Sequence, residues 1–166
     1  MTRYLIACAL LVLAACSSKQ ADSAKEAAAP AAVEAVAADS VITLADDDLF
    51  RPGKAVATPV VLDFNATWCI PCKKLAEPME MAAEEYAGKV AFYTVDFEKN
   101  PKTAEAFGVT EVPCVIILTP DGKAATYPSL NDFISAEKLS DPQMGSDDVK
   151  LEIYNNLTAK IGEILK

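Results

Sequence analysis

Apolar runs and amphipathic stretches alternate along the chain from about residue 41 to the C-terminus. Residues 60–64 and 112–118 are nearly continuous apolar runs, which is typical of strands buried on both faces. Residues 90–96 show the alternation of a strand. Residues 73–87, and the stretch that begins at 147, repeat apolar residues at the spacing of amphipathic helices. The pattern therefore predicts strands and helices that alternate around a core.

Shorter elements fill the spaces between these. The pattern predicts short strands over 41–44 and 124–127 and short helices over 46–50, 101–107 and around 130–134. The turn before the strand at 124–127 joins it as a hairpin to the preceding strand. In chain order, these elements predict an α/β fold in which a central mixed β-sheet is flanked by helices, in three α/β/α layers.

Charge and composition narrow the classes of function. The chain of 166 residues has a formal charge of −9 and 52% hydrophobic residues, enough for one ordinary domain with extensions. The acidic balance argues against nucleic acid as a partner, because phosphate binding needs a basic patch. The chain has no histidine, which excludes Ser-His and Cys-His catalysis and most catalytic zinc sites. We expect no metal and no cofactor.

The N-terminus has the pattern of an export signal. Arg3 precedes an apolar run over 4–13 that is too short to span a bilayer. The run ends in Leu-Ala-Ala-Cys at 13–16, which resembles the lipobox of bacterial lipoproteins, where the chain is cut before a cysteine that is then lipidated. We expect a lipoprotein signal peptide over 1–15 and lipidation of Cys16. Ordinary cleavage after a small residue and an uncleaved anchor are the alternatives.

Residues 16–40 are a low-complexity, alanine-rich stretch with scattered charges. The stretch lacks the large apolar residues that would offset its ordering entropy, so we interpret it as a flexible linker on the lipid anchor. The resemblance to lipoproteins, with Ser17 after the cysteine, implies the periplasm or cell envelope and favours the outer membrane. Residues 41–166 are then the folded domain.

Cys69 and Cys72 are the strongest chemical signal. They lie between the apolar run 60–64 and the amphipathic stretch that follows, where a helix start favours the thiolate through unpaired N–H groups and the helix dipole. Pro71 suits a first helical turn, because it needs no N–H partner there. Cys69 would attack a substrate disulfide, and Cys72, expected to be more buried, would resolve the mixed disulfide. Half of a zinc site, with Cys114 as the one further cysteine of the domain, and an inert structural bridge are the alternatives.

The sequence around these cysteines resembles the thioredoxin family. Residues 63–73 (Asp-Phe-Asn-Ala-Thr-Trp-Cys-Ile-Pro-Cys-Lys) match its active-site strand and turn closely. Further family motifs recur at their usual spacings, at Val95-Asp96, Asn100-Pro101, Phe107-Gly108-Val109 and Val112-Pro113. The likeness covers 41–127 specifically and the last helix only generally. It implies the thioredoxin fold and thiol–disulfide oxidoreductase activity through a redox-active Cys69–Cys72 disulfide.

The resemblance also implies roles for the residues around the cysteines. Asp63 corresponds to a buried acid that assists proton transfer to and from the second cysteine; a strand-end residue that reaches water is the alternative. Pro113 corresponds to a cis-proline, and Val112 before it would offer its backbone to an extended substrate peptide. Substrate contacts are also expected from the residues beside and between the cysteines, Trp68, Ile70 and Pro71. For Trp68, a packing aromatic is the alternative.

Three positions depart from the family's pattern. Phe92 stands where many thioredoxins have a lysine near the buried acid, so we expect Asp63 to be more desolvated and its pKa to be raised. Cys114 replaces a threonine; we interpret it as a small buried hydrophobe, with a third redox participant as the alternative. Asn65 replaces a common tryptophan, which predicts looser packing near the site.

The dipeptide between the cysteines bears on the direction of the reaction. Strong oxidants of this fold often have histidine there, whereas Pro71 resembles reducing members. We therefore predict an extracytoplasmic protein-disulfide reductase. Its substrates would be disulfide-containing exported proteins, including apocytochromes, and its electrons would come from a membrane thiol carrier. A disulfide oxidase or isomerase, or a non-catalytic partner-binding module that uses the cis-proline groove, are the alternatives.

Overall fold

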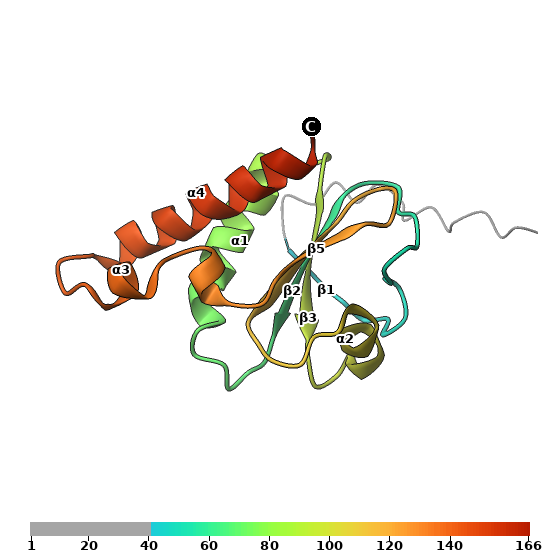
Figure 1. Ribbon diagram of the computed structural model, residues 1–166, viewed down its shortest axis with the longest axis horizontal. Helices are drawn as coiled ribbons and strands as arrows, with labels where there is room; N and C mark the ends of the chain where they lie inside the picture. Colours follow the sequence, from blue (N-terminus) through green and yellow to red (C-terminus); the bar gives the residue numbers. More distant parts are fainter. Residues whose placement is uncertain (1–40) are drawn as a thin grey trace, which may run out of the picture.

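A five-stranded sheet organises residues 41–166, the part of the chain that the structure, a computed structural model, describes (Figure 1). The predicted signal peptide (1–15), Cys16 and the predicted linker (16–40) lie outside the described residues. The strands are β1 (Ile42–Thr43), β2 (Val60–Asn65), β3 (Ala91–Asp96), β4 (Cys114–Leu118) and β5 (Ala124–Tyr127). The helices are α1 (Lys73–Glu85), α2 (Pro101–Phe107), α3 (Ala136–Ser140) and α4 (Ser146–Ile164), with a short 3-10 helix, η1 (Leu130–Asp132).

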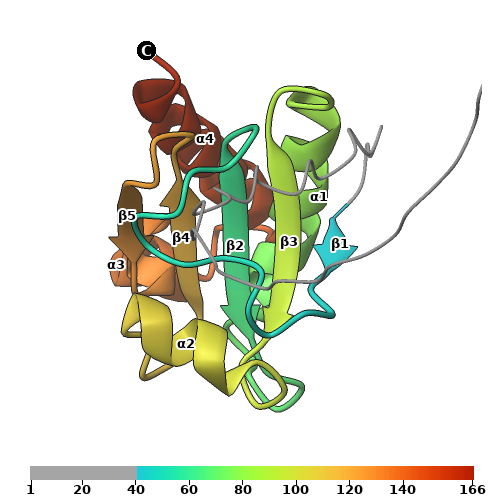
Figure 2. The same ribbon diagram turned by 90° about the vertical axis from the view of Figure 1, so that its right-hand side faces the viewer.

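Strand β2 lies at the middle of the sheet. The strand order is β1-β3-β2-β4-β5; β1, β3 and β2 are parallel, and β4 is antiparallel to both β2 and β5. In Figure 1, α1 and α4 lie on one side of the sheet and α2 on the other, and Figure 2 shows the order of the strands face on. This mixed sheet with flanking helices confirms the predicted fold class. Because both faces of β2 are covered, four of its six residues are apolar, the exceptions being Asp63 and Asn65.

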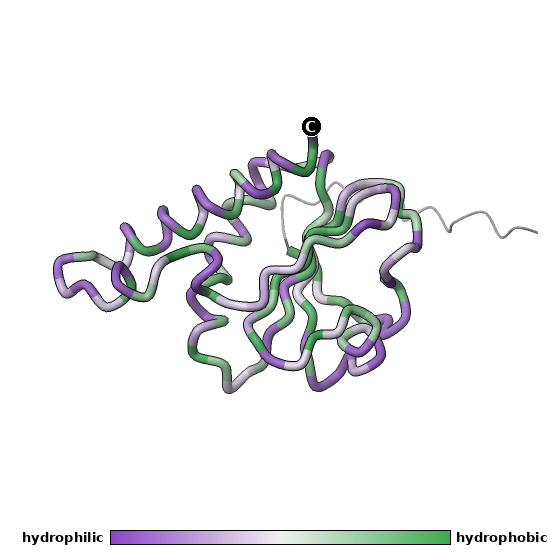
Figure 3. Tube along the Cα trace, in the orientation of Figure 1, coloured by the Kyte–Doolittle hydropathy of each residue, from purple (hydrophilic) through white to green (hydrophobic). Residues whose placement is uncertain are grey.

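A hydrophobic core lies on each face of the sheet. On the side of α1 and α4, Val61 packs in one core with Leu75 and Leu157. On the opposite face, Phe64 packs in a second core with Ile116. Figure 3 shows hydrophobic residues along the strands and polar residues on the outer side of α4. Successive residues of β2 thus alternate between the two cores, as the pleat of a strand requires.

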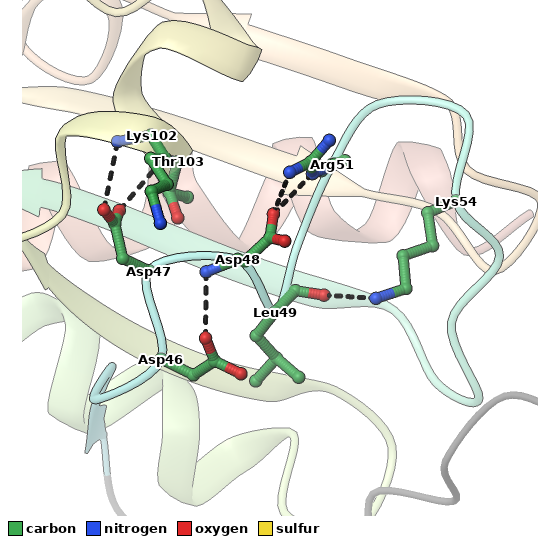
Figure 4. Close-up of polar contacts among 8 residues, drawn as sticks. All are labelled: Asp46, Asp47, Asp48, Leu49, Arg51, Lys54, Lys102 and Thr103. Atoms are coloured by element: carbon green, nitrogen blue, oxygen red, sulfur yellow. Dashed lines mark hydrogen bonds and ion pairs between the residues drawn. The ribbon is translucent and has the colours of Figure 1, made fainter.

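The helix predicted for residues 46–50 is a turn in the structure. The Asp46 carboxylate accepts a hydrogen bond from the backbone N–H of Asp48 (3.0 Å), and local bonds of this kind compete with helix formation. The Asp47 carboxylate instead accepts hydrogen bonds from two backbone N–H groups at the start of α2, at 3.0 and 3.2 Å (Figure 4). Its negative charge therefore stabilises the N-terminus of a helix far along the chain.

The boundaries of the elements around β4 and after β5 also differ from those that the sequence predicts. The strand predicted from residue 112 begins at Cys114, after a cis peptide bond between Val112 and Pro113. The helix predicted around 130–134 is the short η1, and α3, for which the sequence predicts no helix, follows it. At five residues, α3 is too short to show a periodic pattern. Within residues 41–166, none of the helices has the length and apolar character needed to cross a membrane.

Candidate active site

Cys69 and Cys72 form a disulfide in the turn between β2 and α1. Cys72 is the N-cap of α1, so the second thiol lies at the helix terminus itself. The side chains of Cys69 and Cys72 are 3% and 5% exposed, so the expectation that Cys72 is the more buried is wrong for the oxidised form. The two cysteines form one small buried cluster with Ala66, and Val112 packs against it. These shared neighbours explain why both cysteines are buried.

The backbone at the start of α1 is directed at the sulfur of Cys69. The N–H of Cys72 donates a hydrogen bond to Cys69 Sγ over 3.1 Å. The carbonyl groups of Ile70 and Pro71 accept hydrogen bonds from the next turn, so the segment between the cysteines folds as a helical entry. When the disulfide is reduced, the same N–H group and the helix dipole favour a thiolate at Cys69.

The surface beside the disulfide is apolar. Trp68 is 62% exposed and Ile70 is 71% exposed, and Pro71 between the cysteines is exposed as well. Val112, half-buried, packs against the cysteine cluster, and Pro113 after it is buried. The structure thus brings together all five residues for which substrate contacts are expected. The exposure of Trp68 shows that it is not a packing aromatic.

Asp63 lies buried within β2, not at a strand end that reaches water. Within residues 41–166, its Oδ1 has no hydrogen-bond partner. Burial raises the pKa of Asp63 from 3.8 to about 7, against a hydrogen bond from Asn65 that lowers it. The carboxyl therefore exchanges a proton near neutral pH, as a proton-transfer group must.

The raised pKa of Asp63 that the sequence predicts from Phe92 is confirmed in direction. Phe92 pairs with Val61 across the β2–β3 ladder and is buried in the core under α1 and α4. The residue of β3 opposite Asp63 is Thr94, which carries no charge. Desolvation therefore raises the pKa of Asp63 without compensation from a cation.

Cys114 is a free, buried thiol on the other face of the sheet. It pairs with Phe64 and belongs to the core on the α2 side, outside the cluster of Cys69 and Cys72. Burial, with smaller contributions from nearby carboxylates, raises its pKa to about 11. The thiol is therefore protonated at neutral pH, which fits the interpretation of Cys114 as a small buried hydrophobe.

Asn65 and Thr94 are site residues whose role the sequence does not reveal. The looser packing expected at Asn65 stays a prediction, and Asn65 lines a cavity beside Asp63. Its amide group bonds to Thr94 Oγ1 over 2.5 Å and to the carbonyl oxygen of Asp63 over 3.1 Å. The sequence feature that could identify Asn65 is its spacing: it follows Asp63 by two residues and therefore lies on the same face of β2. Thr94 carries no signal until the register of β3 is known.

A zinc site is the metal-based alternative that the sequence leaves open for the cysteines. Among residues 41–166, no group of three or more Cys, Asp or Glu side chains is placed to hold a metal ion. Cys69 and Cys72, the candidates for half of a zinc site, are bonded to each other. The chemistry that this arrangement offers is thiol–disulfide exchange at an apolar surface.

Comparison with known proteins agrees with the geometry of the site. The thioredoxin family model matches residues 40–140. The chain belongs to the thioredoxin family. It is 30% identical over 79 residues to a thioredoxin of Thiocapsa roseopersicina, an alignment that covers 48% of this chain and 87% of that protein.

Two further thioredoxins illustrate the range of similarity. Thioredoxin H-type of Chlamydomonas reinhardtii is 48% identical over 67 residues, but the alignment covers 40% of this chain and only 59% of that protein. The long form of thioredoxin f from spinach chloroplast superimposes with a TM-score of 0.53 and 24% identity, covering 77% of this chain and 88% of that one. The latter supports the fold alone.

Proposed function

We propose that this thioredoxin-family protein is an extracytoplasmic protein-disulfide reductase that acts through Cys69 and Cys72. The observation that carries the proposal is the Cys69–Cys72 disulfide at the N-terminus of α1, flanked by exposed Trp68 and Ile70. An apolar surface beside a helix-terminal cysteine suits an unfolded or extended polypeptide whose disulfide is accessible.

The reaction is a balanced two-step exchange. The Cys69 thiolate attacks a substrate disulfide, forms a mixed disulfide and releases one substrate thiolate, which takes a proton from solvent. Cys72 loses its proton and attacks Cys69 Sγ, which forms the Cys69–Cys72 disulfide and releases the second substrate thiolate. Two electrons pass from the protein to the substrate. A dithiol donor then reduces Cys69–Cys72 by the same chemistry in reverse.

Asp63 is the proposed base for Cys72. It is buried, it lines the same cavity as Cys72, and its pKa of about 7 lies in the range where a group both takes and gives a proton. The proton of the Cys72 thiol passes to the Asp63 carboxylate when Cys72 attacks the mixed disulfide.

The sequence outside the described residues supports the proposed location of the reaction, and the proposed partners depend on that location. The signal-like residues 1–15 and Cys16 support a lipid-anchored protein of the periplasm or cell envelope, with the outer membrane favoured. Its substrates are then disulfides in exported proteins, and its electron donor is a membrane thiol carrier. Pro71 and the absence of histidine support the reducing direction.

Trapping in cells tests the activity and the anchor together. The full chain with Cys72→Ala should accumulate mixed disulfides with other proteins in the membrane fraction, because Cys69 attacks but nothing resolves the product. Adding Cys69→Ala should abolish capture, whereas adding Cys114→Ser should leave it unchanged. Adding Cys16→Ala should move the captured complexes out of the membrane fraction. Capture that persists without Cys69 would indicate a binding module, and membrane retention without Cys16 would contradict the lipid anchor.

A further inference from the structure

The side chain of Asn65 contacts three oxygen atoms around Asp63. Its Nδ2 lies 2.5 Å from Thr94 Oγ1, 3.1 Å from the carbonyl oxygen of Asp63 and 3.4 Å from Asp63 Oδ2. A carbonyl and a carboxylate only accept hydrogen bonds, so the amide must present its NH₂ group, not its oxygen, to Asp63. Asn65 is therefore a hydrogen-bond donor to the buried acid from the same face of β2.

Asp63 and Asn65 line a cavity that also reaches Cys72. The cavity has a volume of about 410 Å³, room for several water molecules, and its walls are partly polar. The Asp63 carboxylate lines this cavity, and its Oδ1 has no hydrogen-bond partner among residues 41–166. A buried carboxylate oxygen beside a partly polar cavity of this size can bind ordered water, and water can carry a proton between Cys72 and Asp63.

Few other groups act on the Asp63 carboxylate. The ionisable side chains that share its cavity come from α1 and its N-cap: Cys72, Lys73 and Glu80. Strands β1 and β3 contribute the hydroxyl groups of Thr43 and Thr94, and on β4 the Cys114 thiol lies on the opposite face. Within the described chain, Asn65 is the one side chain that donates a hydrogen bond to this carboxylate.

We propose that Asn65 is a positioning residue that favours the ionised Asp63 carboxylate and orients it toward the cavity shared with Cys72, so that Asp63 takes the thiol proton during resolution of the mixed disulfide. The inference rests on the proposed function. In the step, the Cys72 thiol gives its proton to Asp63, the Cys72 sulfur bonds to Cys69 Sγ, and the bond from Cys69 to the substrate sulfur breaks. The substrate leaves as a thiolate.

The direction of the expected effect follows from the hydrogen bond. Burial raises the pKa of Asp63 to about 7, and the Asn65 donor opposes that rise. Without the donor, burial acts unopposed, and the pKa of Asp63 rises further. Because only ionised Asp63 accepts the proton, the pH at which resolution becomes fast should rise with that pKa.

The experiment compares the full chain with its Asn65→Leu variant, which keeps the volume but removes the donor. Cys69 is loaded with thionitrobenzoate as a mixed disulfide, and release of the coloured thiolate by Cys72 is followed from pH 5 to 9. The midpoint should rise by about one pH unit in Asn65→Leu. Thr94→Val, which removes only the hydroxyl that holds the Asn65 amide, should shift it less in the same direction. In an Asp63→Asn background, Asn65→Leu should cause no shift.

A direct titration separates this inference from the proposed function. The Asp63 carboxyl pKa, followed by carbon-13 NMR in the oxidised full chain, should rise in Asn65→Leu and, by less, in Thr94→Val. If neither variant moves that pKa or the release midpoint, the role of Asn65 is overturned, whatever the wild type does. If the wild-type chain fails to reduce protein disulfides with a dithiol donor, the proposed function is overturned, whatever Asn65 does to Asp63. Thr94→Val provides the test even where Asn65→Leu does not fold.

Discussion

Asp63 places a carboxyl group in one of the least polar parts of the molecule, within the central strand β2. Burial disfavours its ionised form, and only Asn65 among the described residues donates a hydrogen bond to it. An acid in such a place reduces stability when it is charged. We infer that the chain retains it because a proton acceptor beside Cys72 serves the exchange reaction.

The effect of Asp63 on stability should depend on pH. Its pKa is raised from 3.8 to about 7, so the folded protein binds more protons than the unfolded chain between these values, and stability falls as pH rises through them. Asp63→Asn removes this loss. Urea unfolding of the oxidised chain should show the variant more stable than the wild type at pH 8, by up to about 4 kcal/mol, and much less so near pH 4.

An equal difference at both pH values would contradict this account of Asp63. It would mean that the substitution changes packing or hydrogen bonding and does not remove a buried charge. A variant less stable than the wild type at pH 8 would contradict it as well.

Helix α4 shows how an amphipathic pattern translates into packing at the scale of the element. Leu157 is 0% exposed and packs in the core with α1 and the sheet, whereas Leu151 on the same helix is 51% exposed. The two positions carry the same side chain in the same element. They differ in burial alone, which makes them a matched pair.

Truncation of these leucines should therefore have unequal effects. Leu157→Ala should lower the free energy of unfolding by about 2–5 kcal/mol, because it leaves a cavity in the core. Leu151→Ala should change it by no more than about 0.5 kcal/mol. Chemical denaturation of both variants checks the difference, and similar losses for the two would show that α4 does not pack on α1 as described.

Elements with a local sequence signal are predictable, and contacts between distant segments are not. The apolar run of β2 and the spacing of apolar residues in α1 and α4 depend on neighbours along the chain, so the sequence is sufficient for them. Asp47 shows the limit. Its charge suits a helix N-terminus, but that helix is α2, more than fifty residues away, and no local pattern identifies it.

The candidate site likewise contains residues that the local sequence predicts and contacts that it does not predict. Cys69, Cys72 and Asp63 lie within ten residues of one another, where the apolar run 60–64 and the amphipathic stretch 73–87 predict a strand, a turn and a helix, and the family resemblance implies the role of Asp63. The contact between Asn65 and Thr94 depends on the register of β2 against β3, which a single sequence does not provide. The polar partners that adjust the pKa of Asp63 therefore become visible only in the folded chain.

At the scale of the whole molecule, a thioredoxin-family domain over the described residues follows a sequence that predicts export and lipidation. The same domain chemistry runs toward reduction or oxidation according to the relative stability of the dithiol and disulfide forms. In this chain no histidine lies near the cysteines to stabilise the thiolate of the reduced form. The direction of electron flow is therefore the central claim of the proposed function.

The reduction potential of the Cys69–Cys72 pair tests that claim most directly. The full chain is equilibrated with dithiothreitol or glutathione buffers of defined ratio, and the fraction of oxidised pair is measured by alkylation of free thiols, with Cys114→Ser as a control for the free thiol of the folded domain. We predict a potential near the value of about −270 mV found for reducing members of this fold. A potential near about −120 mV, typical of its strong oxidants, would contradict the reductase proposal.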